Sequence, residues 1–385
     1  MNLQQSEISD IIKSALRNGE LKVDIAESVD WNKVYEVFHY HRITPLVSNI
    51  LDKLQIDETV LKRWREENLK FHRYNAIAYS VQQEICDALE GQVPYVILKG
   101  TAVAVYYPVP QNRTCGDIDV LVAAESFDKA VDILKSKGFE FPGNDPSLRH
   151  TAARKSGIRI ELHVYFGNNQ GSAIDKKISG ALNASVVAHI DKFSFRMLPD
   201  FENGLVILEH LEHHILAGLG IRQTLDFIMY VDRVLDDEFW DTKFKSAAED
   251  LHLDTLAKTI ARIGQIYFDI GESAKWCRDA DLDLCEKVFT MIFEFGHTNP
   301  SLKALNKGRG GIVKRLKYEQ RSGLLNWNAA KKHKALRPFA WIYGGMRHVY
   351  LLANDKNARN RFTSDIKESR SQLELAKRLG IYETE

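Results

Sequence analysis

The sequence predicts an α+β protein with a small sheet near the middle of the chain and helices before and after it. Short β-rich runs cluster within about residues 78–200, and the segments on either side carry apolar residues at helical spacing. At 385 residues the chain is longer than one ordinary domain. We therefore expect an N-terminal helical unit over 1–77, a core over 78–200 and a C-terminal helical domain over 201–385.

The N-terminal unit contains three predicted helices. Asp30 is a good N-cap for a helix over 31–38, and Thr44 or Pro45 begins a second helix that reaches Leu54. A long helix from about 57 to 89 then leads into the first strand.

The first strand, 93–98, is a short apolar run that ends in a glycine turn. Lys99, Gly100 and Thr101 form this turn, and 102–107 reads as a helix. A strand, a glycine turn and a helix start are typical of a phosphate cradle, because backbone N–H groups are free there. Thr101 is a candidate N-cap and Lys99 adds a positive charge, although such a turn alone is weak evidence.

The second strand carries two carboxylates at a spacing of two residues. Asp117 and Asp119 share one face of this strand, while residues 118, 120 and 122 point into the core. Two such carboxylates repel each other, and a bound cation offsets the repulsion. The pair therefore predicts a Mg²⁺ site, the alternative being a solvated face of an edge strand.

Three further elements complete the predicted core. Residues 126–137 have the apolar spacing of a helix, and 193–198 read as the last strand. Between them, 158–166 alternates apolar with polar side chains, and Ser156-Gly157 predicts a hairpin back to 148–154.

The polar face of the 158–166 strand carries Glu161 and His163. If this strand lies beside that of Asp117, Glu161 becomes a third carboxylate at the metal site, and otherwise it is an ordinary solvated residue. His163 either orients Glu161, touches an acceptor, or packs in the core.

Several motifs together resemble a known family. Gly-Thr after a strand, Asp-x-Asp on the next strand and one acid on a later strand follow the order of the polymerase-β-like nucleotidyltransferase superfamily, and within it the chain resembles the bacterial branch called nucleotidyltransferase family 5. The matching segments are 95–100, Arg113, 116–122 and 160–163, with 41–46 and 220–226 outside the core. Thr101 departs from the serine or second glycine of many members.

The resemblance implies a small mixed sheet with helices, and Mg²⁺-dependent (or Mn²⁺-dependent) transfer of a nucleoside monophosphate from ATP or another NTP to an acceptor hydroxyl, with release of pyrophosphate. In this reaction Asp117 and Asp119 hold the metal ions, and Glu161 binds the acceptor-side metal or takes the acceptor proton. The expected phosphate contacts are Lys99, Gly100, Thr101 and Arg113, with a structural role as the alternative for Arg113.

The acceptor side is less defined. His163 is a candidate there because it shares a strand face with Glu161, and His213 belongs to a helical histidine cluster that either lies on the helix surface or faces the nucleotide site. The resemblance adds Arg222 and Asp226, which also have the spacing of a helix-surface ion pair. His210 and His214 are four residues apart, but their order with the glutamates differs from a zinc-protease motif.

Charge is balanced overall and uneven locally. Lys plus Arg and Asp plus Glu number 52 each, which excludes neither a nucleotide nor a protein partner. The segment 301–350 holds twelve Lys and Arg residues against one acid, Glu319. It suits RNA, an anionic surface or the phosphates of the nucleotide, or it is a solvated face beside core aromatics.

Cysteine spacing, the length of apolar runs and the N-terminal sequence exclude some classes of protein. The four cysteines form no C-x-x-C pair or zinc spacing, and no apolar run reaches about 18 residues. The N-terminus lacks the pattern of a signal peptide. We therefore expect a cytoplasmic protein without a membrane anchor.

Two classes of function stay open. The first is an enzyme whose acceptor is a small molecule, a protein side chain or an RNA end. The second is a non-catalytic nucleotide sensor, or an RNA or protein interaction module, that retains the fold. Three acidic residues favour the enzyme, since a site that only binds gains little from such repulsion.

Overall fold

The computed structural model describes residues 3–17, 29–141, 150–166, 171–215, 219–295, 327, 334–343, 346 and 374–381. The chain divides into two compact units. The first comprises residues 1–212 and 220–294, and the second comprises 213–219 and 295–385. The predicted acidic residues all belong to the first unit.

The N-terminal helices begin where capping residues stand. They are α1 (Leu3–Leu16), α2 (Trp31–Tyr40) and α3 (Glu58–Leu89). The Asp30 side chain accepts a hydrogen bond from the Lys33 N–H at 3.2 Å, and Asp57 accepts one from the Val60 N–H at 3.0 Å. The predicted starts of α2 and α3 are thereby confirmed.

The predicted helix from Thr44 to Leu54 is instead two short 3₁₀ turns, η1 (Thr44–Val47) and η2 (Leu51–Lys53). The indole N–H of Trp64 donates to the Thr44 carbonyl at 3.0 Å. Because this carbonyl would otherwise accept the next bond of an α-helix, the tertiary contact favours the tighter turn.

Six strands form one mixed sheet in the order β3-β4-β2-β1-β6-β5. Strand β2 is antiparallel to β1 and parallel to β4, and β1 is parallel to β6. The hairpins β3–β4 and β5–β6 form its two ends. The six strands are β1 (Tyr95–Leu98), β2 (Ile118–Val122), β3 (His150–Lys155), β4 (Ile158–His163), β5 (Val186–Ile190) and β6 (Phe193–Met197).

The sheet confirms the predicted α+β class and all five predicted strands. Ser156 and Gly157 both have positive φ, 51° and 79°, as a two-residue hairpin turn requires. Strand β5 was not predicted. It lies at the edge with Val186 and Val187 exposed, so it lacks the alternation that marks a half-buried strand.

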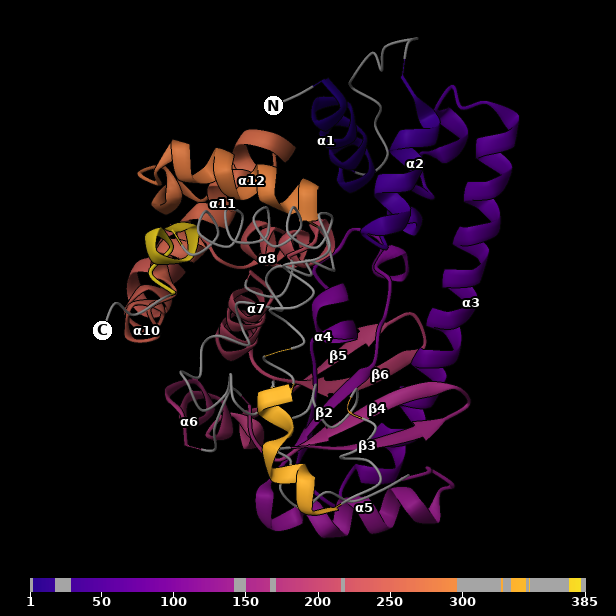
Figure 1. The fold of residues 1–385 in the computed structure, drawn as a ribbon, viewed down its shortest axis with the longest axis vertical. Coiled ribbons are helices and arrows are strands. Elements are labelled where there is room, and N and C mark those ends of the chain that lie inside the picture. Colours follow the sequence, from indigo (N-terminus) through magenta and orange to yellow (C-terminus); the bar gives the residue numbers. More distant parts are fainter. Residues whose placement is uncertain are drawn as a thin grey trace. The chain divides into compact units, whose positions relative to one another are not determined.

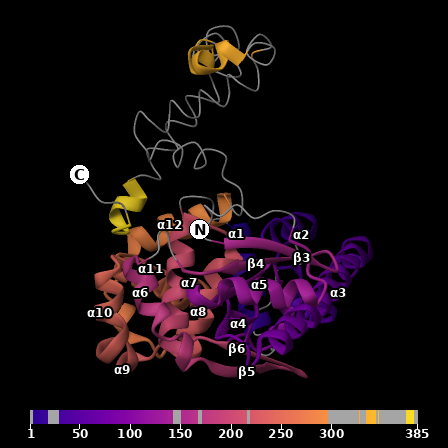
Figure 2. The same ribbon diagram turned by 90° about the horizontal axis from the view of Figure 1, so that it is seen from below.

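Helices lie on both sides of the strands (Figures 1 and 2). Helix α3 runs behind the sheet in Figure 1 and contacts β6, β4 and α5, whereas α7 to α11 lie on the opposite side of the strands from α3. The helices after α3 are α4 (Gly100–Ala104), α5 (Phe127–Ser136), α6 (Ala173–Ser179), α7 (Asp200–Ile215), α8 (Ile221–Arg233), α9 (Asp237–Phe239), α10 (Lys245–Asp250), α11 (Asp254–Phe268) and α12 (Leu282–Phe295). Shorter turns are η3 (Pro110–Asn112), η4 (Ala124–Ser126), η5 (Leu182–Ala184), the π-helical η6 (Trp240–Phe244) and η7 (Lys275–Cys277).

Helices α7 and α8 meet at a glycine. A Cβ at Gly204 would stand 2.3 Å from the Tyr230 ring, so only glycine admits this ring. The Tyr230 hydroxyl donates to the Asp200 carbonyl at 2.9 Å, and the ring packs edge-on against Tyr106. This aromatic contact joins the C-terminal helices to the segment that follows α4.

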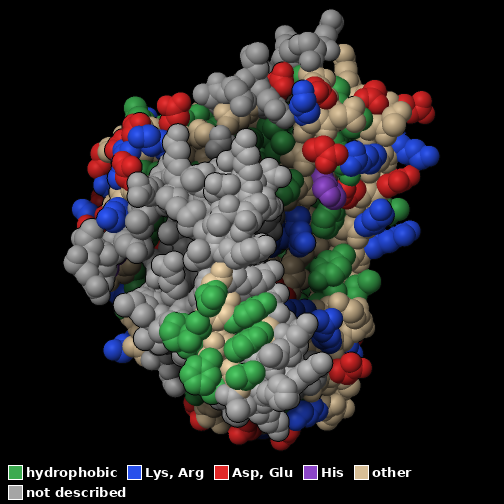
Figure 3. Space-filling model, viewed as in Figure 1, with side chains coloured by type: hydrophobic (Ala, Val, Ile, Leu, Met, Phe, Trp, Pro, Cys, Tyr) green, Lys and Arg blue, Asp and Glu red, His purple; other side chains and the backbone are tan. Residues whose placement is uncertain are grey.

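Most of the predicted basic segment 301–350 lies outside the described residues. Its described part includes η8 (Lys334–Phe339), and Trp327 stacks on Tyr343 with ring centroids 5.3 Å apart. Hydrophobic side chains gather where Figure 1 draws this helical segment in orange (Figure 3), and Phe339, Trp341, Ile342 and Met346 are exposed there. Within the described part of the chain, no helix combines the length and apolarity that crossing a bilayer requires.

Candidate active site

Two neighbouring strands bring the predicted acids together. Asp119 on β2 stands opposite Glu161 on β4 in the parallel ladder, and His163 lies two residues farther along β4. One ligand atom from each of these three side chains lies within 4.8 Å of the others. The predicted juxtaposition of the two strands is confirmed, and it produces a cluster of two carboxylates and an imidazole.

Asp119 is buried and held by two neighbours. Its Oδ1 accepts a hydrogen bond from Lys99 Nζ at 3.2 Å and lies 2.9 Å from His163 Nε2. Burial alone would favour the neutral acid, but Lys99 and His163 outweigh it and lower the pKa of Asp119 to about 2. The carboxylate is therefore ionised at neutral pH.

Glu161 is ordered by its own strand. Its Oε1 lies 2.5 Å from Arg159 Nη2, and its Oε2 lies 3.7 Å from His163 Nε2. His163 therefore lies between the two carboxylates and is in position to orient both.

Asp117 stands immediately before β2 and reaches solvent. Partial burial, together with the charges of Asp119 and Glu161, raises the pKa of its carboxyl. The Tyr74 hydroxyl donates to the Gly116 carbonyl at 3.0 Å and so fastens the backbone beside it. The charge of Lys99 offsets only part of this repulsion at Asp117.

This donor set fits a divalent metal ion. Carboxylate oxygens are ligands of Mg²⁺ and Mn²⁺, while an imidazole nitrogen suits transition ions better than Mg²⁺. Asp119, Glu161 and His163 could together hold such an ion.

The glycine turn lies beside the acids, with an unusual backbone. Lys99 has φ 51° and ψ −145°, a conformation that L-residues rarely adopt, and Gly100 has φ 40°. Helix α4 begins at Gly100 with Lys99 as its N-cap residue. This strained turn aims the Lys99 ammonium at Asp119.

Thr101 does not cap the helix, contrary to prediction. It is the second residue of α4, and its buried hydroxyl donates to Gln82 Oε1 at 2.7 Å. A small cavity lies here, lined by Gln82, Gly100, Thr101 and Asp117 among others. At this turn the backbone N–H groups, rather than the Thr101 hydroxyl, are available to bind an anion.

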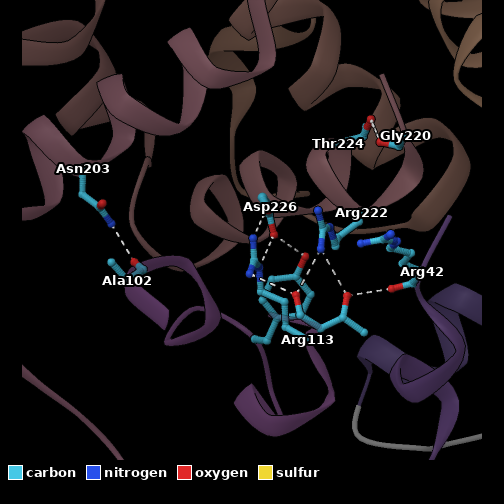
Figure 4. A network of polar contacts seen from close by, with 10 residues as sticks. Arg42, Ala102, Arg113, Asn203, Gly220, Arg222, Thr224 and Asp226 are labelled. Carbon is cyan, nitrogen blue, oxygen red and sulfur yellow. Dashed lines mark hydrogen bonds and ion pairs between the residues drawn. The ribbon is translucent and has the colours of Figure 1, made fainter. Parts of the chain in front are cut away.

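Arg113 is buried and lies against α8 (Figure 4). Its Nε and Nη2 donate to the two carboxylate oxygens of Asp226 at 2.7 and 2.6 Å, and the Tyr107 hydroxyl donates to the same group at 2.8 Å. Although burial opposes the charge, Asp226 raises the pKa of Arg113. The pair fastens the loop before β2 to α8, which is the structural alternative considered for Arg113.

Arg222 therefore does not have the partner that its spacing suggested. Asp226 pairs with Arg113, and among the described residues Arg222 Nη1 makes long contacts of 3.3 and 3.4 Å to the carbonyl and hydroxyl of Thr114. His213 belongs to the second unit, so its place at the site stays a prediction.

Sequence reasoning missed the polar face of α3. The Asn75 amide donates to the carbonyls of Gln111 and Arg113 and accepts from the Cys115 N–H, all at 2.9–3.0 Å. Asn68, Asn75 and Gln82 are buried polar residues at a spacing of seven along the helix. That spacing on an otherwise apolar face is the signal that would have found them.

Comparison with known proteins agrees with this arrangement. The sequence profile of a family described as uncharacterised nucleotidyltransferases matches residues 27–269, which include β1, β2, β4 and α8. The chain belongs to this nucleotidyltransferase family. The resemblance predicted from the motifs is thus confirmed.

The other comparisons add little to this family assignment. No curated protein matches the sequence. The crystal structure of an antigenic nucleotidyltransferase-like protein from Paracoccidioides brasiliensis is similar over 45% of this chain and 86% of that chain, at 14% identity and a TM-score of 0.32. This similarity is too low to support any inference about the site.

Proposed function

We propose that this protein transfers a nucleoside monophosphate from an NTP to an acceptor hydroxyl and releases pyrophosphate. The observation that carries the proposal is the pairing of Asp119 with Glu161 on adjacent parallel strands, with His163 beside them. The charges of both acids also act on Asp117. Family membership supports nucleotidyl transfer as the class of reaction.

In this reaction the acceptor oxygen attacks the α-phosphorus, the bond from that phosphorus to the bridging oxygen breaks, and pyrophosphate leaves with the electron pair. Asp117, Asp119 and Glu161 would hold Mg²⁺ or Mn²⁺, which when bound neutralises phosphate charge and lowers the pKa of the attacking hydroxyl. Glu161 would bind the acceptor-side metal or receive the acceptor proton. His163 keeps the Asp119 carboxylate oriented.

The phosphate end of the nucleotide is assigned to the turn after β1. Backbone N–H groups at Gly100 and Thr101 are the proposed contacts for the β- and γ-phosphates. Lys99 contacts Asp119 at 3.2 Å and lies beside this turn, so its ammonium can pair either with the Asp119 carboxylate or with the phosphates. The acceptor class stays open between a small molecule, a protein side chain and an RNA end.

A nucleotide sensor without turnover is the second candidate, and one observation favours it. Lys99 and Arg159 each lie within 3.2 Å of one of the three carboxylates, so part of their repulsion is offset by the protein itself. Isothermal titration with the four common NTPs separates the two functions. Equal NTP affinity with and without Mg²⁺ would favour the sensor, whereas Mg²⁺-dependent affinity supports the enzyme.

The direct test uses NTP labelled at either the α- or the γ-phosphate, incubated with the protein and a cell extract. We expect the α-label, and not the γ-label, to enter one acceptor fraction. Asp119→Asn should reduce this labelling by about 100-fold or more, because the metal site loses a buried ligand charge. Asp132→Asn, an exposed position on α5, is the matched control and should label like the wild type. Wild-type labelling by Asp119→Asn would exclude this site.

A further inference from the structure

Cations outnumber anions where α8 meets the N-terminal helices and the loop before β2. Arg42, Arg113 and Arg222 gather there around one carboxylate, that of Asp226 (Figure 4). Asp226 is fully engaged by Arg113 and Tyr107. Within the described ranges, neither Arg42 nor Arg222 forms an ion pair with an acidic side chain. This surplus of positive charge costs stability unless an anion offsets it.

Arg222 shows the imbalance most directly. Among the residues that the structure describes, its buried Nε has no hydrogen-bond partner, and buried polar atoms in proteins nearly always have one. Burial and the neighbouring charge of Arg113 lower the pKa of Arg222 to about 10, so it remains charged at neutral pH. It also stands in the first turn of α8, where the helix dipole disfavours a cation.

Arg42 stands beside it at a tight corner. It follows α2 with φ 56°, its carbonyl accepts the Thr114 hydroxyl at 2.7 Å, and its side chain is exposed. The same Thr114 hydroxyl lies 3.4 Å from Arg222 Nη1. Tyr74, whose hydroxyl donates to Gly116, experiences the charges of both Asp117 and Arg42. Thr114, which contacts both arginines, stands three positions before Asp117 in the loop that leads into β2.

We propose that Arg42 and Arg222 bind the phosphate chain of the nucleotide. This inference rests on the proposed function, because it assigns the two arginines to the same NTP. Of the cations that the motifs suggested for this role, Arg113 is held by Asp226 and Lys99 is shared with Asp119. Arginine binds phosphate oxygens through paired N–H donors, and among the described residues neither Arg42 nor Arg222 pairs its charge with an acidic side chain.

The test measures equilibrium binding of Mg·NTP, of inorganic tripolyphosphate and of the matching nucleoside to the full chain. We expect Arg42→Gln and Arg222→Gln each to weaken binding of Mg·NTP and tripolyphosphate by about tenfold, the effect of one lost charge-assisted hydrogen bond. Nucleoside binding should not change. Arg233→Gln, at the exposed end of the same helix, is the control and should bind like the wild type.

Folding does not confound this comparison. Arg42 is exposed, and removal of Arg222 relieves repulsion with Arg113, so both variants should melt no lower than the wild type in the absence of nucleotide. Wild-type affinity of both variants for Mg·NTP and tripolyphosphate would overturn the proposal, as would a wild-type protein that binds neither.

The two proposals fail in different ways. A wild type that binds NTP but transfers no α-label rejects the enzyme, and the arginine subsite still stands if both variants lose affinity. Conversely, normal labelling with unchanged affinity in both variants rejects the subsite alone.

Discussion

Asp117 and Asp119 are two residues apart, yet their surroundings act on them in opposite directions. Asp119 lies between Lys99 and His163, so its ionised form is stabilised by the fold. Asp117 is partly desolvated and lies near the charges of Asp119 and Glu161, so its ionised form is disfavoured. One carboxylate thus contributes to stability at neutral pH while its neighbour lowers it.

For Asp119, the folded-state pKa of about 2 lies below its ordinary value of 3.8. The ionised Asp119 contributes about 2 kcal/mol to the free energy of unfolding. This contribution is complete above pH 3.8 and is lost as the pH falls toward 2. Asp119→Asn should therefore be less stable than the wild type at neutral pH, and this difference should close with acidification. Thermal midpoints of both proteins across this range provide the measurement.

Asp117→Asn serves as the opposite-sign control in the same series. Since the folded state raises the pKa of Asp117, its ionised form costs stability above that pKa and nothing below the ordinary value. The variant should gain stability at neutral pH, by about 1 kcal/mol or less because solvent screens this exposed group. A loss of stability in Asp117→Asn would contradict the repulsion inferred for the cluster.

At the scale of elements, the contact between α7 and α8 depends on the absence of one side chain. Gly204→Ala would place a Cβ 2.3 Å from the Tyr230 ring. We expect it to lower the free energy of unfolding by about 2 kcal/mol or more, because the ring must leave its position and its hydrogen bond to Asp200. Urea titration monitored by circular dichroism measures this loss.

Gly180→Ala is the matched control for that substitution. Gly180 has helical φ of −65°, and the nearest atom to an added Cβ lies 3.9 Å away. This variant should be unchanged or more stable by about 0.5 kcal/mol, because alanine reduces the freedom of the unfolded chain. Equal losses at both glycines would show that the Tyr230 contact is not the cause.

The elements themselves were largely predictable because their signals are local. The alternation over 158–166 fixed which side chains of β4 share a face, and hence that Glu161 and His163 lie together. The helix cap at Asp57 placed the start of α3. By contrast, the 3₁₀ turn at Thr44 follows from a contact with Trp64, twenty residues away, which no local pattern contains.

At the scale of the first compact unit, the buried pair Arg113–Asp226 ties the loop before β2 to helix α8. Removal of one partner leaves the other charge uncompensated in the interior, at a cost of about 3–5 kcal/mol. Arg113→Met and Asp226→Asn should each destabilise strongly, and the double variant should recover most of that loss. Asparagine still accepts from the Tyr107 hydroxyl, so this bond is retained.

A double-mutant cycle on thermal midpoints, run beside the α-label assay, measures this coupling. Additive losses would indicate that the two residues act independently. If stability recovers in the double variant and transfer does not, the charges also matter for catalysis.

Long-range pairs of this kind explain what the sequence could not predict about the site. The motif identified Arg113 but not its partner, because the two are 113 positions apart and either could equally bind solvent or a ligand. The side chains of Asn75 and Gln82 can likewise form hydrogen bonds, but the sequence does not indicate which groups are their partners. Periodicity sets the direction of a side chain within an element, while tertiary packing decides which group it meets.

The turn at Lys99 places a permanent cation against the deepest carboxylate of the cluster, at the cost of a strained backbone. Such a tethered ammonium acts as a resident counterion. The fold can therefore persist when no metal ion is bound, and in the proposed reaction the supply of ions would regulate turnover without depleting the protein.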